Sequence, residues 1–423
     1  MPMTSSKKTS QLFLRALLRS LARLTVKRFS PMIIGVTGSV GKTSTKEAIA
    51  AALSSSRRVA KSPGNLNNEL GLPLAIIGGY ERIERPALLF WMKVIARAIV
   101  QLCCSSAKSF PEILVLEYAA DAPGDIAYLL SIAKPHIGVI SAIGSHPVHA
   151  EHYPLGAEGV LKEKAKLVLH LGAGDTAVLN ADDTSIKDLT GKIRSRMMFF
   201  GESSHATIKI SHITHDMKEN KIQGLMFKLE SEGLMLPVHL SGVFSSAHAY
   251  AVAAAVCVAR ACDINPITAV QAIEKWYEPV GGRSALVPGM KDTQIIDESY
   301  NSSPLALEAA LKSFGLIYNT RKIAVLGDML ELGAYTIQAH KNGGVLAARY
   351  LDALITVGPR GRILGEEALE KGMSDNAVFF CEDAKQASAI LLKIFKKGDI
   401  ILIKGSRAMG LDEVVAAVRK EEA

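Results

Sequence analysis

Hydrophobic positions in this chain fall into short β-rich runs that alternate with helical stretches from residue 32 onward. Runs rich in Val, Ile and Leu predict strands at 32–36, 113–117, 136–143 and 177–180. Helical spacing predicts helices at 42–54, at 124–133 and, in an Ala-rich stretch, at 246–262. Residues 205–240 show short alternating runs, which are typical of an antiparallel insertion. Strands that alternate with helices in this way indicate parallel βαβ units.

The composition changes over residues 280–291, where Gly281, Gly282, Pro288 and Gly289 lie close together. Such clusters are typical of interdomain linkers. Beyond this stretch, strands are predicted at 294–297, 322–326, 353–357 and 399–404. A chain of 423 residues also exceeds what one hydrophobic core usually serves. We therefore predict an α/β fold with a central parallel-sheet domain over residues 31–289 and a smaller α/β domain over residues 290–423.

The first 30 residues predict a basic amphipathic helix. They contain seven Lys and Arg residues and no Asp or Glu, whereas the whole chain has a net charge of +8. The remainder is nearly neutral, so no nucleic-acid partner is predicted. Arg15, Arg19 and Arg23 recur at helical spacing. The other side of the same helix carries leucines, namely Leu14, Leu17, Leu18, Leu21 and Leu24.

Three interpretations of this helix stay open. Its leucine face docks on the neighbouring domain, or residues 10–29 lie on an anionic membrane surface at the inner face of the membrane, or the segment is a targeting peptide. The segment lacks the uninterrupted apolar stretch and the small-residue cleavage site of a secretory signal. A second amphipathic helix is predicted at 88–104, with Lys93 and Arg97 one turn apart. The two helices face the same membrane or each other.

The overall composition, with 48% hydrophobic and 21% charged residues, is that of a soluble α/β enzyme rather than a disordered chain. No apolar run is expected to reach the roughly 18 residues that span a bilayer. The five cysteines are odd in number and lack C-x-x-C spacing, which favours neither a disulfide framework nor a structural zinc site. These features predict a protein of the reducing cytoplasm.

Residues 32–45, MIIGVTGSVGKTST, run from a predicted strand through a glycine-rich loop into a predicted helix. Gly38 and Gly41 let the backbone turn its N–H groups toward phosphate oxygens at the positive end of the helix. Lys42 supplies a charge for the β- and γ-phosphates, and Thr43 offers a hydroxyl to Mg²⁺. Val36 stands where the common eight-residue pattern has glycine, but G-x-x-G-K-T remains specific in this context. The sequence therefore predicts a phosphate-binding loop made of Gly38, Ser39, Val40, Gly41, Lys42, Thr43 and Ser44.

Two further groups follow predicted strands. Glu117 ends an apolar strand, where open α/β sheets place ligand-binding groups, and a carboxylate there suits Mg²⁺ opposite Thr43. His146, His149 and His152 lie in the loop after the next strand. Their spacing does not fit a zinc site. One of them approaches the phosphates, or all three are surface loop residues.

Several of these motifs together resemble the Mur ligases. They are the phosphate loop, the stretch NLNNELGLP at 65–73, the strand ending in Leu116 and Glu117, and NADD at 180–183. SYN at 299–301, LGDMLELG at 326–333 and KGSR at 404–407 resemble the D-alanyl-D-alanine-adding branch of the family. The resemblance covers residues 32–415. It implies a central P-loop ATPase domain, a smaller C-terminal Rossmann-like α/β domain that closes over it, and ATP with two Mg²⁺ ions as cofactors.

The resemblance also implies a reaction. A substrate carboxylate attacks the γ-phosphate of ATP, and an amine then displaces phosphate from the acyl phosphate to form an amide, with positioning and charge stabilisation carrying most of the catalysis. The implied acyl substrate is a peptidoglycan precursor, and the implied amine is a dipeptide or an amino acid. A Mur-type ligase for another polymer, of polyglutamate or cyanophycin type, and a nucleotide-dependent binding protein remain alternatives. A monomer is expected.

The resemblance assigns roles residue by residue. Lys164, in KEKAKL, matches a lysine that is carbamylated in the family, and an unmodified surface lysine is the alternative. Catalytic roles are implied for Lys42, Lys164, His149 and Arg283. Metal ligation is implied for Thr43, Glu117, His149 and Lys164. The phosphate loop is joined in nucleotide binding by Asn180, Asp183, Asp297, Tyr300 and Asn301. Substrate binding is implied for Asn67, Asn68, Asp328, Glu331, His340, Lys404 and Ser406.

The sequence also departs from the family pattern. The family's N-terminal domain, which binds the uridine nucleotide, precedes the phosphate loop, whereas only the basic segment 1–30 precedes it here. We therefore expect that this chain does not hold a uridine nucleotide in the usual way. Glu298, Ser303 and Lys166 replace a common Asp, Asn and Glu, and the lysine reverses a charge. The substrate is accordingly less well defined by the sequence than the reaction.

Overall fold

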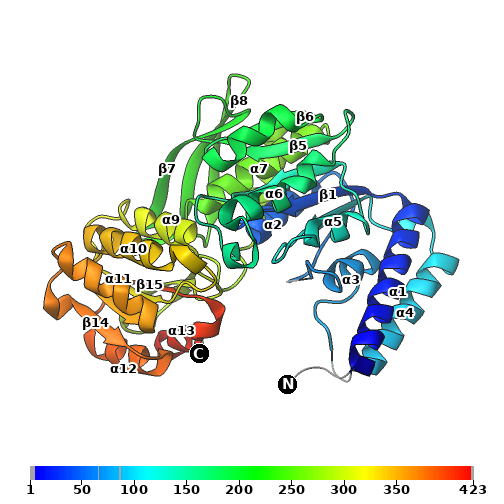
Figure 1. Cartoon of the computed structure of the whole chain (residues 1–423). Coiled ribbons are helices and arrows are strands. Elements are labelled where there is room, and N and C mark those ends of the chain that lie inside the picture. The colour runs from blue at the N-terminus through cyan, green and yellow to red at the C-terminus, as the bar shows by residue number, and fades with distance from the viewer. Residues whose placement is uncertain (1–4, 65, 85–86, 421–423) are drawn as a thin grey trace.

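The structure is a computed structural model that describes residues 5–64, 66–84 and 87–420, with only the backbone described for 5–11. Residues 1–4 of the basic segment and Asn65 of the quoted motif lie outside the described residues. Two β-sheets, each covered by helices, lie side by side in Figure 1, and helices α1 and α4 form the end of the molecule farthest from the C-terminal sheet. The α/β fold class predicted from the sequence is confirmed.

The larger sheet has nine strands among the described residues, in the order β2-β3-β1-β4-β5-β6-β7-β8-β9. Neighbours from β2 to β7 pair in parallel, and β7, β8 and β9 pair antiparallel. The predicted antiparallel insertion is thus an extension of the same sheet. The strands are β1 (Met32–Thr37), β2 (Val59–Lys61), β3 (Ile113–Glu117), β4 (Ile137–Ile140), β5 (Thr176–Asn180), β6 (Arg196–Gly201), β7 (Ile208–Lys218), β8 (Lys221–Ser231) and β9 (Leu234–Ser241).

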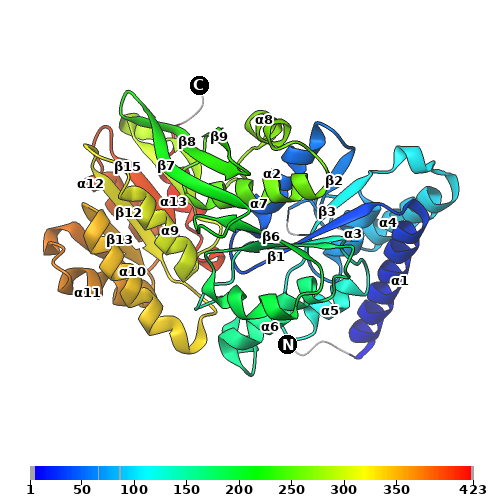
Figure 2. The same cartoon turned by 90° about the horizontal axis from the view of Figure 1, so that it is seen from above.

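Side chains of the larger sheet alternate between two cores, as the period of two along a strand requires. In β1, Ile34 and Val36 face one core, whereas Ile33 faces the other. The first core is covered by α2 (Lys42–Ser54), α7 (Ala247–Ala261) and α8 (Pro266–Trp276). The second face is covered by α3 (Gly71–Ile77), α5 (Asp125–Leu130) and α6 (Gly156–Leu169). Figure 2 shows these helices on opposite sides of β1.

The smaller sheet has six strands within the described ranges, in the order β10-β11-β15-β12-β13-β14. Only its edge strand β10 (Ala285–Pro288) pairs antiparallel, and it lies inside the stretch predicted to be a linker. The other strands are β11 (Gln294–Glu298), β12 (Lys322–Gly327), β13 (Ala353–Val357), β14 (Val378–Cys381) and β15 (Ile400–Lys404). Helices α9 (Pro304–Phe314), α10 (Thr336–Tyr350) and α11 (Pro359–Glu370) cover one face. Helices α12 (Ala384–Ile394) and α13 (Asp412–Val418) cover the other.

The two sheets also share a core. Phe244, which follows β9, packs edge-on against Phe314 of α9 with ring centroids 5.3 Å apart. Ile222 of β8 belongs to the same buried cluster, and its backbone N–H donates to Gln294 Oε1 of β11 at 2.9 Å. The β7–β8 hairpin therefore reaches across to the smaller sheet.

The basic N-terminal segment forms helix α1 (Ser5–Phe29), which packs on α3 and α4 (Ala87–Cys104). Leu18 and Leu21 of α1 are buried, so docking of the leucine face on the neighbouring domain is confirmed for these two side chains. Helix α4 corrects the expectation that no apolar run reaches the length that spans a bilayer. By length and composition alone, α4 is long and apolar enough to cross a membrane, with a mean hydropathy of 1.7, and only 17% of it is buried.

Candidate active site

The phosphate loop connects the end of β1 to the start of α2. Strand β1 lies between β3 and β4 in the larger sheet, so the loop lies where the order of the strands reverses. Open α/β sheets bind their ligands at such a switch point. Gly38 has a φ of 148°, and a Cβ there would lie 2.2 Å from Ser141 Oγ. The N–H of Ser39 donates to the carbonyl of Ala142 at 2.7 Å. The loop is therefore held against the end of β4, and only glycine fits at position 38.

Lys42 begins α2, and its ammonium group is directed back over the loop. Its Nζ donates to the carbonyl oxygens of Gly38 at 2.9 Å and Ser39 at 3.4 Å. Burial lowers the pKa of Lys42, the Glu117 carboxylate opposes this, and the Arg283 guanidinium adds to it. A buried cation in this position suits a ligand that brings negative charge, such as a triphosphate.

Thr43, Glu117 and Asn67 form a hydrogen-bonded group beside the loop, in which Thr43 and Glu117 are buried. Thr43 Oγ1 donates to Glu117 Oε2 at 2.9 Å, and Asn67 Nδ2 donates to Glu117 Oε1 at 3.0 Å. Among the described residues, no cluster of three His, Cys, Asp or Glu side chains stands ready to hold a metal ion. Mg²⁺ in nucleotide sites takes one or two protein oxygens and completes its shell with phosphates and water. The hydroxyl and carboxylate of this group fit that requirement.

Lys164 lies on α6 with 2% of its surface exposed. Its Nζ donates to the carbonyl of Ala120 at 3.4 Å. Burial, together with the nearby charge of Lys42, lowers the pKa of Lys164 to about 7, against the opposing charge of Asp121. At neutral pH a substantial part of this amine is therefore uncharged, unlike that of a surface lysine.

His149 lies between two carboxylates from different sheets. Its Nε2 is 3.4 Å from Asp121 Oδ1, and its Nδ1 is 2.9 Å from Glu331 Oε2. Its backbone N–H also donates to the carbonyl of Glu331 at 2.9 Å. Burial lowers the pKa of His149, and the positive charge of Lys164 lowers it further, whereas the two carboxylates raise it. His149 and Glu331 thus connect the two sheets at the edge of the site.

The smaller sheet contributes cationic groups opposite the phosphate loop. The guanidinium of Arg283 lies 4.3 Å from the centre of the Tyr300 ring, and that of Arg407 lies 5.4 Å from it. Lys404 Nζ forms a buried ion pair with Glu298 Oε2 at 2.8 Å and donates to the carbonyl of Asn301 at 3.1 Å. Positive charge is therefore available on both sides of the space between the sheets.

A cavity of about 540 Å³ opens between the two sheets. Predicted residues from both domains line it, namely Ser39, Val40, Gly41, Lys42, Ser44, Asn67, Glu117, His149, Arg283, Tyr300, Asn301, Glu331 and Lys404. Thr43 adjoins it through Glu117. Lys164 is close enough to Lys42 for their charges to interact. The volume is in the range of small-ligand sites at domain interfaces.

Three predicted substrate residues, Asp328, His340 and Ser406, do not line this cavity. They hold the loop that carries Glu331. Asp328 Oδ1 accepts the N–H of Gly361 at 2.7 Å, and the N–H groups of Met329 and Leu330 donate to His340 Nε2 at 3.0 Å and Ser406 Oγ at 2.9 Å. The positions of His340 and Ser406 support an indirect role, because they fix the backbone just before Glu331, which does face the cavity. Asp328 instead ties the start of this loop to the start of α11.

Four other predicted residues are also engaged with backbone outside the lining of the cavity. Asp183 Oδ2 accepts the N–H of Ile143 at 2.6 Å, and Asn180 Nδ2 donates to the carbonyl of Ser141 at 3.0 Å. Asp297 Oδ2 accepts the N–H of Gly282 at 3.1 Å, next to Arg283. Asn68 Oδ1 accepts the N–H of Gly71 at the start of α3. These side chains set the shape of the loops around the nucleotide site.

Sequence reasoning missed Asp121 and His248 and left Arg407 without a role, yet all three line the cavity. Asp121 follows β3 by four residues, so its place after a strand ending in Glu117 was an available signal. Arg407 ends the KGSR motif quoted for the family resemblance. His248 begins an Ala-rich helix and gives no signal in the sequence, because its position depends on how α7 packs.

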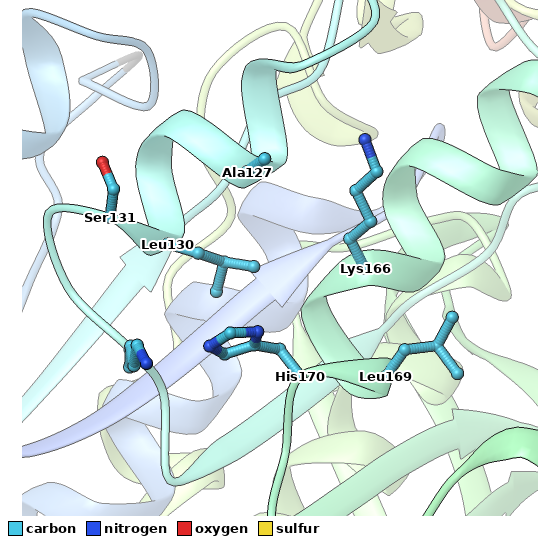
Figure 3. A pocket seen from close by; sticks show the side chains of 7 residues that line it. Ala127, Leu130, Ser131, Lys166, Leu169 and His170 are labelled. Atoms are coloured by element: carbon cyan, nitrogen blue, oxygen red, sulfur yellow. The ribbon is translucent and has the colours of Figure 1, made fainter.

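A second depression lies between α5 and α6 and is lined by Ala127, Leu130, Ser131, Lys134, Lys166, Leu169 and His170 (Figure 3). The side chains of Ser131 and Lys166 lie on opposite sides of this view, and neither points toward the other. Lys166 Nζ is engaged by Glu163 Oε2 at 2.6 Å, which balances the charge reversal noted in the sequence. These polar groups do not converge on a common point, so the depression does not resemble a binding site.

The phosphate loop, the carboxylate beside it and the cationic groups across the cavity define a two-domain enzyme that binds a nucleoside triphosphate. A model of the Mur ligase middle domain matches residues 36–83 and 97–258. A model of the Mur ligase glutamate ligase domain matches residues 282–407. The chain therefore belongs to the Mur ligase family and is an ATP-dependent carbon–nitrogen ligase.

Individual relatives agree with this assignment. The UDP-N-acetylmuramoyl-tripeptide–D-alanyl-D-alanine ligase of Bacillus subtilis is 28% identical over 401 residues, covering 94% of this chain and 78% of the relative. The enzyme of the same name from Escherichia coli is 27% identical, covering 92% and 77%. The crystal structure of the MurF ligase from Thermotoga maritima with ADP is similar at a TM-score of 0.75 and 26% identity, covering 95% of this chain and 83% of that one.

A more distant likeness concerns the fold alone. The Mycobacterium tuberculosis folylpolyglutamate synthase, solved with ADP and AMPPCP, has a TM-score of 0.66 at 15% identity and covers 97% of this chain and 95% of that one.

Proposed function

We propose that this Mur ligase joins a D-alanyl-D-alanine dipeptide to the peptide of a muramoyl-tripeptide precursor of peptidoglycan. The cavity between the sheets carries the proposal, because it brings the phosphate loop together with cationic groups of the smaller sheet. The names of the Bacillus subtilis and Escherichia coli relatives support the substrates. The reaction takes place in the cytoplasm in this proposal.

In the proposed reaction, the substrate carboxylate attacks the γ-phosphorus of ATP and ADP leaves. The amine of the dipeptide then attacks the acyl carbon, phosphate leaves, and the amine loses a proton as the amide forms. Lys42 lies where it would hold the β- and γ-phosphates, and Arg283 approaches from the other sheet. Bound Mg²⁺, held by Thr43 and Glu117, would neutralise charge that develops on the phosphates.

We also propose that Lys164 is carbamylated in the active enzyme. Carbamylation adds CO₂ to an uncharged amine and releases a proton, so it requires a lysine with a low pKa. Lys164 meets this requirement, because burial lowers its pKa to about 7. The product is an anion beside Lys42 and near His149, where it would serve as a second metal ligand.

Further parts of the proposal concern the state of the protein. We infer a monomer, since one chain supplies both halves of the cavity. We propose domains at 31–289 and 290–423, with β10 at the end of the first range paired to the smaller sheet. Contact of residues 10–29 with the inner face of the membrane is also proposed, because Arg23, Leu24, Lys27 and Arg28 of α1 are exposed.

The test is ADP release by the purified chain with a UDP-linked muramoyl tripeptide, with D-alanyl-D-alanine, with both and with neither. Release only with both substrates, together with a product whose mass equals their sum less one water, is expected. ADP release that needs neither substrate, or that occurs with glutamate and a glutamyl acceptor instead, would contradict the proposed substrates. Lys187→Ala, at an exposed lysine away from the cavity, is the control that should retain the activity.

A further inference from the structure

Helix α4 exposes an apolar face along its whole length. Phe90, Val94 and Ala98 are buried at helical spacing. The opposite face, called here the α4 stripe, consists of Leu88, Leu89, Met92, Ala96, Ile99, Val100 and Cys103, all of which are exposed. Leu88 is 74% exposed, Met92 58% and Val100 59%. Contiguous apolar surface of this kind on a soluble protein marks an interaction site.

Helix α1 runs beside α4 in the same direction. Arg28 Nη2 of α1 donates to the carbonyl of Ser105, just after α4, at 3.3 Å, and Phe29 stacks on Phe110. Leu12 precedes Arg28 by 16 residues, and Leu89 precedes Ser105 by the same number. At a rise of about 1.5 Å per residue, both lie about 24 Å back along their helices. Exposed Leu12 and Phe13 of α1 therefore lie level with the start of the α4 stripe. Figures 1 and 2 both show the two helices side by side.

The charges on these helices are all positive. The segments Ser5–Phe29 and Ala87–Cys104 contain no Asp or Glu. Arg23, Lys27 and Arg28 of α1 and Lys93 of α4 are exposed. Other arginines are engaged within the protein, since Arg15 pairs with Glu69 at 2.7 Å and Arg19 lies over the Tyr128 ring. An apolar stripe with cationic neighbours and no acid on the same helices is complementary to a surface of anionic lipid.

Part of this surface lies outside the family matches. The middle-domain model begins at residue 36 and leaves out 84–96, which holds the first half of α4. Leu88, Leu89 and Met92 lie in that gap, whereas Ile99, Val100 and Cys103 lie inside the matched range. None of the exposed residues of the α4 stripe lines the cavity.

We propose that the α4 stripe and the apolar end of α1 dock on the surface of an anionic lipid bilayer, with α4 lying parallel to the membrane. Binding of a second copy is disfavoured, because pairing these faces would bring cationic helices together without acidic partners. Docking would also orient the enzyme. Arg15 of α1 pairs with Glu69, two residues from Asn67 of the cavity. The loop that carries Asn67 therefore lies near the docked helices. That last consequence rests on the proposed function, whereas docking itself does not.

The experiment is sedimentation of the full chain with vesicles of phosphatidylglycerol and phosphatidylcholine, and with vesicles of phosphatidylcholine alone. We expect binding to the anionic vesicles and little to the neutral ones. Leu89→Glu with Met92→Glu should weaken the partition coefficient on the order of 100-fold, at about tenfold for each buried apolar side chain lost. Arg23→Gln with Lys27→Gln should weaken it about fivefold for each charge. Ile267→Glu, at an exposed apolar position of α8, should leave it unchanged.

Because the substituted side chains are exposed, all variants should unfold at the temperature of the wild type. Failure of the wild type to sediment with either vesicle, or equal binding to both, would overturn the proposal. So would light scattering that shows a dimer which Leu89→Glu with Met92→Glu converts to a monomer. Ligase activity in solution is measured separately, so a chain that docks without ligating would overturn only the proposed function.

Discussion

Lys164 places an amine with a low pKa in the protein interior, and this has a measurable energetic cost. A pKa of about 7 in the folded chain, against 10.5 for the free group, disfavours the protonated form by about 5 kcal/mol at 1.36 kcal/mol per unit. The folded state binds fewer protons than the unfolded state between these two values. Stability therefore rises with pH from about 7 to 10.5, and the penalty is fully present below about pH 7.

Lys164→Met removes the charge while keeping a long side chain in the same space. The variant should be more stable than the wild type at pH 6 by up to about 5 kcal/mol, and the difference should shrink by about 1.4 kcal/mol per pH unit above 7. Ligase activity should be lost at every pH. The two effects have opposite signs, which separates a functional lysine from a merely structural one.

The assay is urea unfolding followed by circular dichroism from pH 6 to 9 in buffer freed of CO₂. Lys162→Met, at an exposed position two residues earlier on the same helix, is the matched control and should change stability little at any pH. Addition of bicarbonate should stabilise the wild type and not Lys164→Met, because only the wild type can form the carbamate. A variant less stable than the wild type throughout this range would refute the reasoning.

Other predictions follow from the cavity. Lys42→Ala should abolish ADP release while the unfolding temperature stays within a few degrees, because Lys42 bonds only to loop carbonyls in the described contacts; normal turnover would contradict the phosphate-site assignment. Lys404→Met should destabilise the chain by about 3–5 kcal/mol in urea unfolding, since Glu298 is left buried without its ion pair, and adding Glu298→Gln should recover part of the loss. Glu117→Gln should raise the Mg²⁺ concentration needed for half-maximal ADP release at least tenfold, and an unchanged Mg²⁺ dependence would argue against this carboxylate as a ligand.

Much of the fold could be predicted because parallel strands are apolar on both faces. Helix α2 and strands β3 and β13 begin and end where the pattern places them. The short strands β2 and β10 were not predicted. Each lies at the edge of a sheet and has only three or four residues, which is too short for a clear hydrophobic pattern. Strand β2 also pairs with the distant strand β3, whereas β10 pairs with β11, which follows it directly. Strand β6 was missed for a related reason, since Arg196 and Met197 at its start are exposed.

Site residues could be predicted where a short motif determines both their chemistry and their local geometry. They were harder to predict where the packing of the fold decides whether a side chain faces the cavity. The phosphate loop, Glu117 and Lys164 come from motifs whose local geometry is contained in a few residues. Glu331, inside the LGDMLELG motif, and His340, shortly after it, are close in the sequence, yet Glu331 faces the cavity and His340 is buried outside its lining. A sequence pattern records that both are needed, and packing decides which of them meets the ligand.

The contact between His149 and Glu331 differs in kind from the apolar contact between the two sheets around Phe244 and Phe314. Both residues have positive φ, 66° and 63°, although neither is glycine. Such conformations cost of order 1 kcal/mol or more each and persist only where surrounding contacts hold them. Here the contacts are a backbone hydrogen bond and charged side chains, which water competes for more easily than for packed apolar groups. At this point the two domains are therefore joined by strained and polar groups rather than by packed apolar side chains.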